Sequence, residues 1–302
     1  MKGVVIKSTG SWYAVMTEDT QIFQCRLKGN FRIQGIRTTN PIAVGDKVDF
    51  ELEPNKDTGV IFSIVPRTNY IIRKSINLSK AAHIIAANID KLYIVASIME
   101  PRTSTGFIDR LLVTAEAYHI PAAIVFNKID IYNQEAGSYC HSLTELYEAI
   151  GYKCYKVSAL KNTGITHLSE ALQGKVNLFS GHSGVGKSAL INAIDSTLHA
   201  KVGEISAVHL KGMHTTTYAE MLPLSFGGFI IDSPGIKEFG LIHFENKEVG
   251  ERFPEFRALL PHCKYNNCTH VHEPGCAVKA ALKQGLVAES RYRNYLSILN
   301  DE

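Results

Sequence analysis

The stretch FSGHSGVGKSAL, at residues 179–190, has the spacing G-x-x-x-x-G-K-[ST] of a loop that binds nucleotide phosphates. Gly181 and Gly186 enclose four residues, and Lys187 and Ser188 follow directly. Glycines allow successive backbone N–H groups to surround a phosphate, and the N-terminal end of a following helix adds positive potential. An apolar run precedes the stretch and a helical run follows it, which favours a phosphate loop over an incidental glycine-rich turn.

The loop also predicts where the phosphates and their metal ion are held. Lys187 is placed to reach the β- and γ-phosphates as a catalytic cation, Ser188 to offer its hydroxyl to Mg²⁺, and Ala189 to donate an amide to the α-phosphate. We expect nucleotide contacts all along the loop, from Gly181, His182, Ser183, Gly184, Val185, Gly186, Lys187, Ser188 and Ala189. Kinases and ATPases share such a loop, so it does not by itself select the base or the reaction.

Two other segments select the base. In NKID, residues 127–130, the Asp130 carboxylate can accept from both guanine N1–H and the 2-amino group, which adenine cannot supply. Asn127 can hold the base and a neighbouring loop, and the stem of Lys128 can cover the ring. Ser158 and Ala159 follow the next predicted strand, where a backbone N–H can meet guanine O6. Each short match has an ordinary loop as its alternative, but the pair predicts a guanine nucleotide and argues against a kinase or ATPase.

Two segments downstream of the phosphate loop are expected to sense the γ-phosphate. Asp232 follows the apolar run FGGFII and opens DSPG; its carboxylate can hold Mg²⁺ through water, and the Gly235 amide can meet the γ-phosphate. The segment HTTT, residues 214–217, lies between the phosphate loop and DSPG. One of its threonines would complete the Mg²⁺ shell; spacing does not decide which, and we favour Thr216 or Thr217.

These motifs run in the order base, base, phosphate, switch, switch, whereas nucleotide switches usually begin with the phosphate loop. Joining the usual ends and opening the chain elsewhere gives the observed order without moving any part. Domain termini often lie close together, so such a circular permutation is tolerated. The sequence therefore predicts one site on a permuted fold, with the second switch running directly into the C-terminal segment.

The patterning predicts a multidomain protein. We expect an OB-like β-barrel at residues 1–68 from short β-rich runs separated by turns, and a permuted P-loop α/β GTPase domain at 69–242, with a basic linker at its start, from alternating strands and helices. A helical zinc-binding domain is expected at 243–302. Residues 20–45 and 67–88 contain no acid, which suggests an RNA-facing surface or, alternatively, a solvated basic face. Their basic residues include Arg26, Lys28, Arg32, Arg37, Arg67, Arg73, Lys74 and Lys80.

The C-terminal segment carries a candidate metal site. Cys263, Cys268, His270 and Cys276 have the spacing C-x₄-C-x-H-x₅-C. Three thiolates and an imidazole suit one tetrahedral Zn²⁺, and a site with no open position is structural. His262 and His272 are rival ligands, and free cysteines with surface histidines are the alternative. A tail of about 60 residues gains from such a metal because its own apolar core is small.

Composition bounds the setting. The chain has 302 residues, 45% apolar and 20% charged, with a net charge of +3 that is too small by itself to argue for a nucleic-acid partner. No apolar run approaches the roughly 20 residues of a membrane span, and the N-terminal MKGVVIKSTG has no signal-peptide core. We expect a cytoplasmic monomer without membrane contact, in which the six cysteines are reduced thiols or metal ligands.

Together these residues resemble the circularly permuted, small-ribosomal-subunit-dependent GTPase A family (RsgA, also called YjeQ) over nearly the whole chain. The resemblance rests on NKID before GHSGVGKS, on HTTT, DSPG and the cysteine–histidine set, and on CRLKGNFR and VGDKV in the barrel. It implies a slow GTPase that binds 16S rRNA late in maturation of the small ribosomal subunit and is strongly stimulated by that subunit. Met213 departs from the family, in which an arginine often precedes HTTT.

The residue after DSPG bears on catalysis. Many GTPases place a glutamine there to orient the attacking water, but Ile236 cannot hydrogen-bond to water. We therefore expect slow hydrolysis by the protein alone. The resemblance points to His214 as the residue that positions the water; the alternative is that His214 is a switch residue without a catalytic role. A second function stays open beside the GTPase: a nucleotide-dependent RNA-binding checkpoint in which hydrolysis is incidental.

Overall fold

A computed structural model describes residues 1–28, 41–74, 82–198, 219–232 and 246–300. The chain forms two compact units, one of Met1–Leu92, Ile165–Ser180 and Lys187–Gly240 and the other of Tyr93–Gly164, Gly181–Gly186 and Leu241–Glu302. Within these described ranges, none of the helices combines the length and the apolarity of a membrane-spanning segment.

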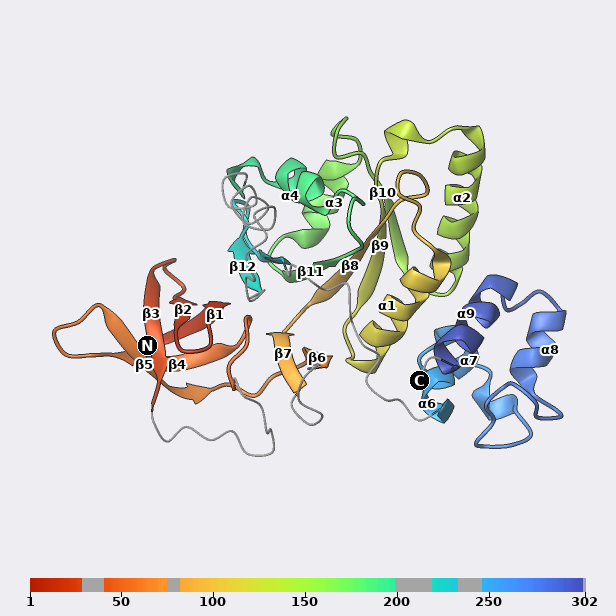
Figure 1. Ribbon diagram of the computed structural model, residues 1–302, viewed down its shortest axis with the longest axis horizontal. Coiled ribbons are helices and arrows are strands. Elements are labelled where there is room, and N and C mark those ends of the chain that lie inside the picture. Colours follow the sequence, from red (N-terminus) through yellow and green to blue (C-terminus); the bar gives the residue numbers. More distant parts are fainter. Residues whose placement is uncertain (29–40, 75–81, 199–218, 233–245, 301–302) are drawn as a thin grey trace. The chain divides into compact units, whose positions relative to one another are not determined.

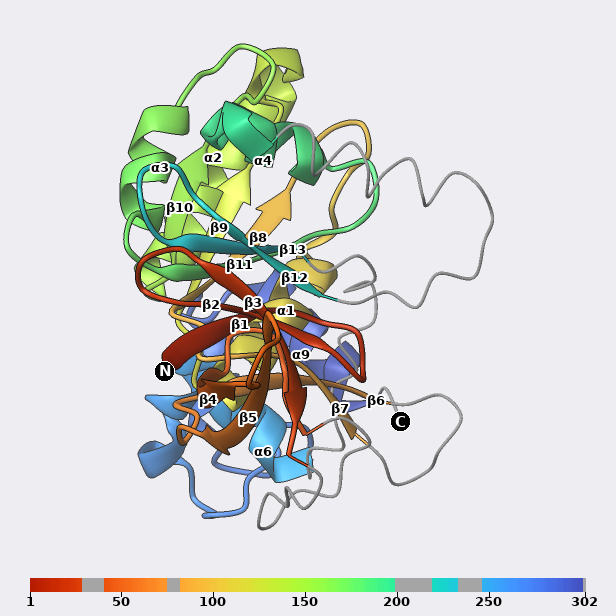
Figure 2. The same cartoon turned by 90° about the vertical axis from the view of Figure 1, so that its left-hand side faces the viewer.

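The first unit begins with a closed barrel. Its strands are β1 (Lys2–Ser8), β2 (Tyr13–Met16), β3 (Ile22–Leu27), β4 (Lys47–Leu52) and β5 (Thr58–Ile64). They are hydrogen-bonded in the order β1-β2-β3-β5-β4, and a further pairing of β1 with β4 closes the ring (Figures 1 and 2). The pairing of β3 with β5 is parallel. This confirms the OB-like barrel expected from the short alternating runs.

The barrel closes because alternate side chains point inward. Its buried core consists of Val5, Tyr13, Val15, Cys25, Ile42, Val48, Phe50 and Ile61. Gly59 lies where β5 crosses this core: a Cβ there would be 2.7 Å from Cys25 Sγ and 2.9 Å from the Phe50 ring. The close approach of backbone to core therefore requires glycine.

A two-stranded hairpin follows the barrel, which the sequence analysis did not predict. Strand β6 (Tyr70–Lys74) pairs with β7 (Ala82–Ala87) in an antiparallel ladder, within the segment expected as a basic linker. The Ala87 N–H donates to Val44 O at 2.8 Å, which attaches the hairpin to the barrel. The runs YIIRK and AHIIAA do have strand composition, although the basic residues of this segment had been interpreted as a linker.

The rest of the first unit contains part of an α/β sheet. Its elements are α3 (Ile165–Leu172), β11 (Val176–Ser180), α4 (Lys187–Ile194), a 3-10 turn (Ser196–Leu198), β12 (Glu220–Pro223) and β13 (Phe229–Asp232). Strands β11 and β13 are parallel neighbours, and β12 pairs with β13 antiparallel. The phosphate-loop sequence thus begins where β11 ends and stops where α4 begins, as its pattern predicts.

The second unit holds the other strands and helices of the α/β fold. They are most of β8 (Lys91–Ala96), α1 (Thr105–Ala117), β9 (Ala122–Phe126), a 3-10 turn (Ile129–Ile131), α2 (Gln134–Ala149) and β10 (Lys153–Lys156). The strand order is β10-β9-β8, and β9 and β10 are parallel. NKID begins directly after β9, so it lies at the carboxyl end of a buried strand, where ligands bind on such sheets.

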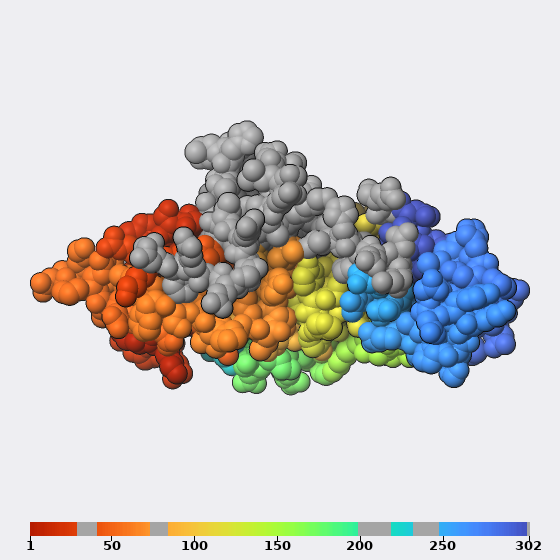
Figure 3. Space-filling view, turned by 90° about the horizontal axis from the view of Figure 1, so that it is seen from below, coloured from red at the N-terminus to blue at the C-terminus, as the bar shows by residue number. Residues whose placement is uncertain are grey.

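The described part of the C-terminal segment is compact and helical. It contains α6 (Asn246–Glu251), α7 (Pro254–Arg257), a 3-10 turn (Leu260–His262), α8 (Ala277–Lys283) and α9 (Glu289–Leu299). Figure 3 shows this segment in blue as one continuous body. Its apolar core includes Phe253, Phe256, Tyr295 and Ile298, joined by Val113 of α1. Helix α9 packs against α1 within the second unit (Figure 1).

Candidate nucleotide site and metal centre

The phosphate loop adopts a backbone that only glycine tolerates well. Gly184 and Gly186 have φ of +80° and +93°. A Cβ on Gly186 would be 2.5 Å from Asn127 Nδ2, and one on Gly181 would be 2.5 Å from the Val95 carbonyl oxygen. Glycine is therefore required by conformation at Gly184 and Gly186 and by close neighbours at Gly181 and Gly186, as expected of a loop whose backbone is its binding surface.

Asn127 joins the phosphate loop to the base-binding segments. Its side chain is buried, and its Nδ2 donates to the carbonyl oxygen of Val185 at 3.1 Å. Its Oδ1 accepts from the backbone N–H of Ala159 at 3.2 Å. One amide therefore holds the loop at 181–186 and the Ser158–Ala159 turn at the same place, although Asn127 and Val185 are 58 positions apart.

Asp130 is oriented by the same turn. The Ser158 hydroxyl donates to Asp130 Oδ1 and accepts from the Lys161 N–H at 3.0 Å. Ser158 is fully buried, whereas Asp130 is exposed. The buried hydroxyl therefore orients a carboxylate that is accessible to solvent. Lys128 has a left-handed backbone, φ +65°, and its Nζ donates to the carbonyl of Glu100. The base-motif side chains are thus held in place by protein contacts, and the Asp130 carboxylate is the exposed one among them.

The side chains at the end of the loop lie at the start of α4. Lys187 is half-buried, and Ser188 and Ala189 are exposed. On the neighbouring strand, the Asp232 backbone pairs with Phe179, two residues before Gly181. DSPG therefore starts at the carboxyl end of the strand beside β11, which suits a residue that meets a phosphate-bound Mg²⁺.

Four of the predicted site residues lie outside the described residues: His214, Thr216, Thr217 and Gly235. Their assignments, and the choice between the two threonines, stay predictions.

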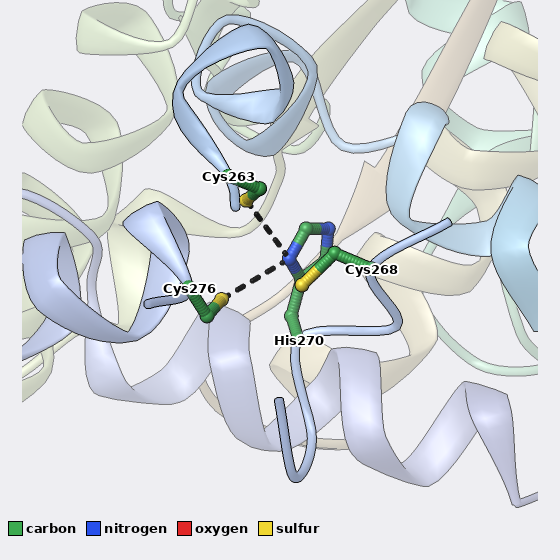
Figure 4. A group of neighbouring side chains, drawn as sticks. All are labelled: Cys263, Cys268, His270 and Cys276. Atoms are coloured by element: carbon green, nitrogen blue, oxygen red, sulfur yellow. Dashed lines mark hydrogen bonds between the residues drawn. The ribbon is translucent and has the colours of Figure 1, made fainter. Parts of the chain in front are cut away.

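The predicted zinc ligands converge. One ligand atom from each of Cys263, Cys268, His270 and Cys276 lies within 4.8 Å of the others (Figure 4). His270 Nδ1 is 3.3 Å from Cys276 Sγ and 3.8 Å from Cys263 Sγ. Tetrahedral Zn²⁺ with bonds of about 2.0–2.3 Å separates its ligand atoms by roughly 3.5–3.8 Å. The rival His262 and His272 are exposed and do not belong to this group.

The surroundings fit a cation as well. Burial lowers the pKa of His270, so its ring is neutral at pH 7 and offers a lone pair. The Lys279 N–H donates to Cys276 Sγ at 3.4 Å, which holds this sulfur at the N-terminal end of α8. Glu273 organises the chain between the ligands by accepting from the N–H groups of Thr269 and Val271, at 2.7 and 3.1 Å.

One buried cluster had no signal in the sequence. Arg291 of α9 is 1% exposed, and its Nη1 donates to Asp109 Oδ1 of α1 at 2.6 Å, 182 positions away. Its Nε donates to Glu255 Oε1 at 2.7 Å. Asp109 also accepts from Tyr147 and Asn294, at 2.8 and 2.6 Å. Arg291 lies in the charged and polar first half of ESRYRNYLSIL, so the sequence alone gives no indication that it is buried against a distant helix.

The structure also corrects the basic surface. Arg67, counted among the RNA-facing residues, forms a buried bidentate pair with Asp46, with two N–O distances of 2.6 Å. Its role is to hold the barrel together. Arg26 is exposed and pairs with Glu53, and Lys28 is exposed. The side chains of Arg32, Arg37, Arg73, Lys74 and Lys80 lie outside the described residues.

Known protein families match both the N-terminal barrel and the region that contains the nucleotide motifs. The sequence model of the family described as RsgA GTPase matches residues 64–242, and that of the RsgA N-terminal domain matches residues 2–61. The small ribosomal subunit biogenesis GTPase RsgA of Bacteroides fragilis is 54% identical over 302 residues, covering 100% of this chain and 97% of that protein. The protein of the same name from Phocaeicola vulgatus is 55% identical with the same coverage.

Two solved structures share the fold. YjeQ from Thermotoga maritima matches with a TM-score of 0.79 and 34% identity, over 99% of this chain and 96% of that one. YloQ, described as a circularly permuted GTPase, matches with a TM-score of 0.77 and 30% identity, over 99% and 94%. The permuted order of motifs is therefore an architecture that solved structures share.

Proposed function

Because this chain belongs to the RsgA GTPase family, we propose that it hydrolyses GTP to GDP and phosphate and acts as a late assembly factor of the small ribosomal subunit. The observation that carries the nucleotide half of this proposal is the Asn127 side chain, which binds both the phosphate loop and the Ser158–Ala159 turn. A phosphate-binding loop and a base-reading segment held together by one amide suit a nucleotide that spans both. The assembly half is supported by the relatives, which are named as small ribosomal subunit biogenesis GTPases.

In this proposal the bound guanine nucleotide is recognised at both ends. Asp130 reads N1–H and the 2-amino group, and Lys128 covers the base. Loop amides and Lys187 meet the phosphates. Ser188 and Asp232 would hold Mg²⁺, with Thr216 or Thr217 completing its shell; the ion offsets the charge of the phosphates. The fit of Ser188 to this role rests on its exposed position at the start of α4.

Hydrolysis by the protein alone is slow in this account. Ile236 follows DSPG and offers no hydrogen bond to an attacking water, so His214 or a group of the ribosome positions that water. Lys187 would stabilise the developing charge, and Thr216 or Thr217 would help hold the Mg²⁺ that neutralises it. In this proposal the small ribosomal subunit completes the positioning of the attacking water, so the rate of GTP hydrolysis depends on that subunit.

The partner we propose is the small subunit through its 16S rRNA. The exposed side chains of Arg26 on β3 and of Lys28, directly after β3, can meet phosphates. In the tail, Cys263, Cys268, His270 and Cys276 would hold one structural Zn²⁺. The protein acts as a cytoplasmic monomer. GTP favours ribosome binding only if it stabilises the binding-competent arrangement more than GDP does.

The test is single-turnover hydrolysis of GTP with and without purified small subunits, using large subunits as the control. We expect slow hydrolysis alone, a rise of orders of magnitude with small subunits and none with large ones. Cosedimentation should be tighter with a non-hydrolysable GTP analogue than with GDP and should weaken as salt rises. An unchanged rate on small subunits, with intact nucleotide-dependent binding, would instead favour the RNA-binding checkpoint.

A further inference from the structure

The imidazole of His182, the second residue of the phosphate loop, is held by a residue of the β8–α1 connection. Its Nε2 lies 2.7 Å from Thr103 Oγ1, and its Nδ1 lies 3.0 Å from the carbonyl oxygen of Ser183. Phe107 of α1 meets the imidazole edge to face, with ring centroids 5.5 Å apart and an interplanar angle of 81°. The ring therefore has contacts at both nitrogens and with an aromatic ring.

The hydrogen-bond partners determine the direction of each bond. A carbonyl oxygen only accepts, so His182 Nδ1 carries a proton and donates to Ser183. In the tautomer with its proton on Nδ1, Nε2 is an acceptor, so the Thr103 hydroxyl donates to it while accepting from the Ser97 N–H at 2.9 Å. The result is one directed chain from Ser97 through Thr103 and His182 to the Ser183 carbonyl.

The Ser97–Thr103 end of this series of hydrogen bonds is fixed by the fold. Thr103 is 4% exposed and Ser97, at the end of β8, is 0% exposed. The Thr103 N–H donates back to the Ser97 carbonyl at 2.8 Å. Ser104 then caps α1 by accepting from the Phe107 N–H at 3.2 Å. The hydroxyl that donates to His182 thus belongs to a buried residue between β8 and α1, which two hydrogen bonds to Ser97 hold in place.

Holding the Ser183 carbonyl also fixes the next amide. A trans peptide is planar, so the Gly184 N–H points opposite to the Ser183 C=O. Gly184 has φ +80° and no Cβ, so its own conformation restricts this peptide little. Without an external hold the peptide can turn, and its N–H is then lost as a phosphate donor.

We propose that Thr103 and His182 are positioning residues of the nucleotide site, which orient the Ser183–Gly184 peptide so that the Gly184 N–H donates to the phosphates of a guanosine diphosphate or triphosphate. The proposal rests on the proposed function, since it concerns the same nucleotide. His182 thereby contributes through its side chain, in addition to the backbone contact expected from the loop pattern.

The test compares GDP affinity, by titration calorimetry on the full-length protein, among wild type, Thr103→Val, His182→Ala and the double variant. Each single change should weaken GDP roughly tenfold, the size expected for one lost hydrogen bond. Because both act on one peptide, the double variant should be no weaker than the weaker single variant. Thr103→Ser retains the hydroxyl and should restore binding. The ³¹P signal of the GDP β-phosphate should shift in both single variants.

Thr114→Val is the matched control. Thr114 is a buried threonine of α1 whose hydroxyl donates to the Arg110 carbonyl oxygen of the same helix at 2.8 Å. It should lower the melting temperature without changing GDP affinity or the ³¹P shift. Equal GDP affinity in Thr103→Val and Thr114→Val, or fully additive losses in the double variant, would overturn the positioning role. Failure of the wild-type protein to bind GDP would overturn the proposed function, and this inference with it.

Discussion

The candidate metal centre and the nucleotide site are assembled in different ways. The predicted ligands of the metal centre all come from residues 263–276, and one ligand atom from each lies within 4.8 Å of the others. The nucleotide motifs are spread from residue 127 to residue 235, and the bond from Asn127 to Val185 crosses 58 positions. A metal centre of this kind depends on local spacing, whereas the nucleotide site depends on how the strands are ordered in space.

The difference explains why permutation is tolerated at one site. The bonds of Asn127 to Val185 and to Ala159 require strand ends to meet, and strand ends meet whatever the order in which the chain visits them. A site built from closely spaced ligands has no such freedom. Moving Cys263 away from Cys276 in the sequence would remove the turn that brings them together.

Removal of the metal tests the local half of the comparison and should have the largest effect. Structural Zn²⁺ contributes about 10–16 kcal/mol of binding free energy to small zinc domains. Chelation, or Cys268→Ala, should therefore loosen the tail while GDP binding is largely retained, since the ligands lie outside the nucleotide motifs. Elemental analysis should find about one zinc per chain, and hydrogen exchange should rise across residues 263–276. Absence of zinc from carefully prepared protein would contradict the site.

Arg291→Met tests how far the tail is independent. The change leaves Asp109 buried without its guanidinium and should destabilise the protein by about 3–5 kcal/mol. Burial raises the pKa of Asp109, a rise that Arg291 now opposes. In the variant the Asp109 carboxyl takes up a proton on folding, because its pKa is higher in the folded than in the unfolded state. The loss of unfolding free energy should therefore be smallest below the ordinary carboxyl pKa of about 4, and it should grow as pH rises through the raised pKa of the folded state.

Arg293→Ala is the matched control for that measurement. Arg293 also lies on α9, and it pairs with Glu289 at 3.0 Å on the exposed surface. Its loss should change the free energy of unfolding by less than about 1 kcal/mol, with no pH dependence of this kind. Equal effects of the two changes in urea unfolding across pH would show that the buried pair does not attach α9 to α1.

Gly186→Ala tests the distributed half. The alanine would have to adopt a φ near +93°, which is strained for a residue with a side chain. Its Cβ would lie 2.5 Å from Asn127 Nδ2 and would disturb the hydrogen bonds that join the loop to the base segments. We expect GDP affinity to fall by about 100-fold, the effect of roughly 3 kcal/mol of strain and lost contacts, with zinc content unchanged. Gly151→Ala shares the strained backbone, φ +101°, but has nothing within 4 Å. That control should lower stability and leave GDP affinity intact.

The sequence predicted the motifs better than the bonds between them. The phosphate loop, NKID and the ligand spacing each have a local pattern, and the barrel strands follow from alternation. The hydrogen bond from Thr103 to His182 and the Asp109–Arg291 pair have no such pattern, because each depends on two distant segments whose meeting only the fold decides. Arg67 shows the same limit, since an arginine in an acid-free stretch is no sign of a buried pair with Asp46.

The central claim is that NKID and the phosphate loop, in inverted order, serve one guanine nucleotide. Asp130→Asn tests it most directly, because the new amide can donate to the 2-oxo group of xanthine where the carboxylate accepted from the 2-amino group of guanine. Affinities of wild type and variant for GTP and XTP should be measured side by side. The account predicts that the variant loses GTP affinity and gains XTP affinity. Unchanged GTP affinity in the variant would remove Asp130 from the base site and contradict the claim.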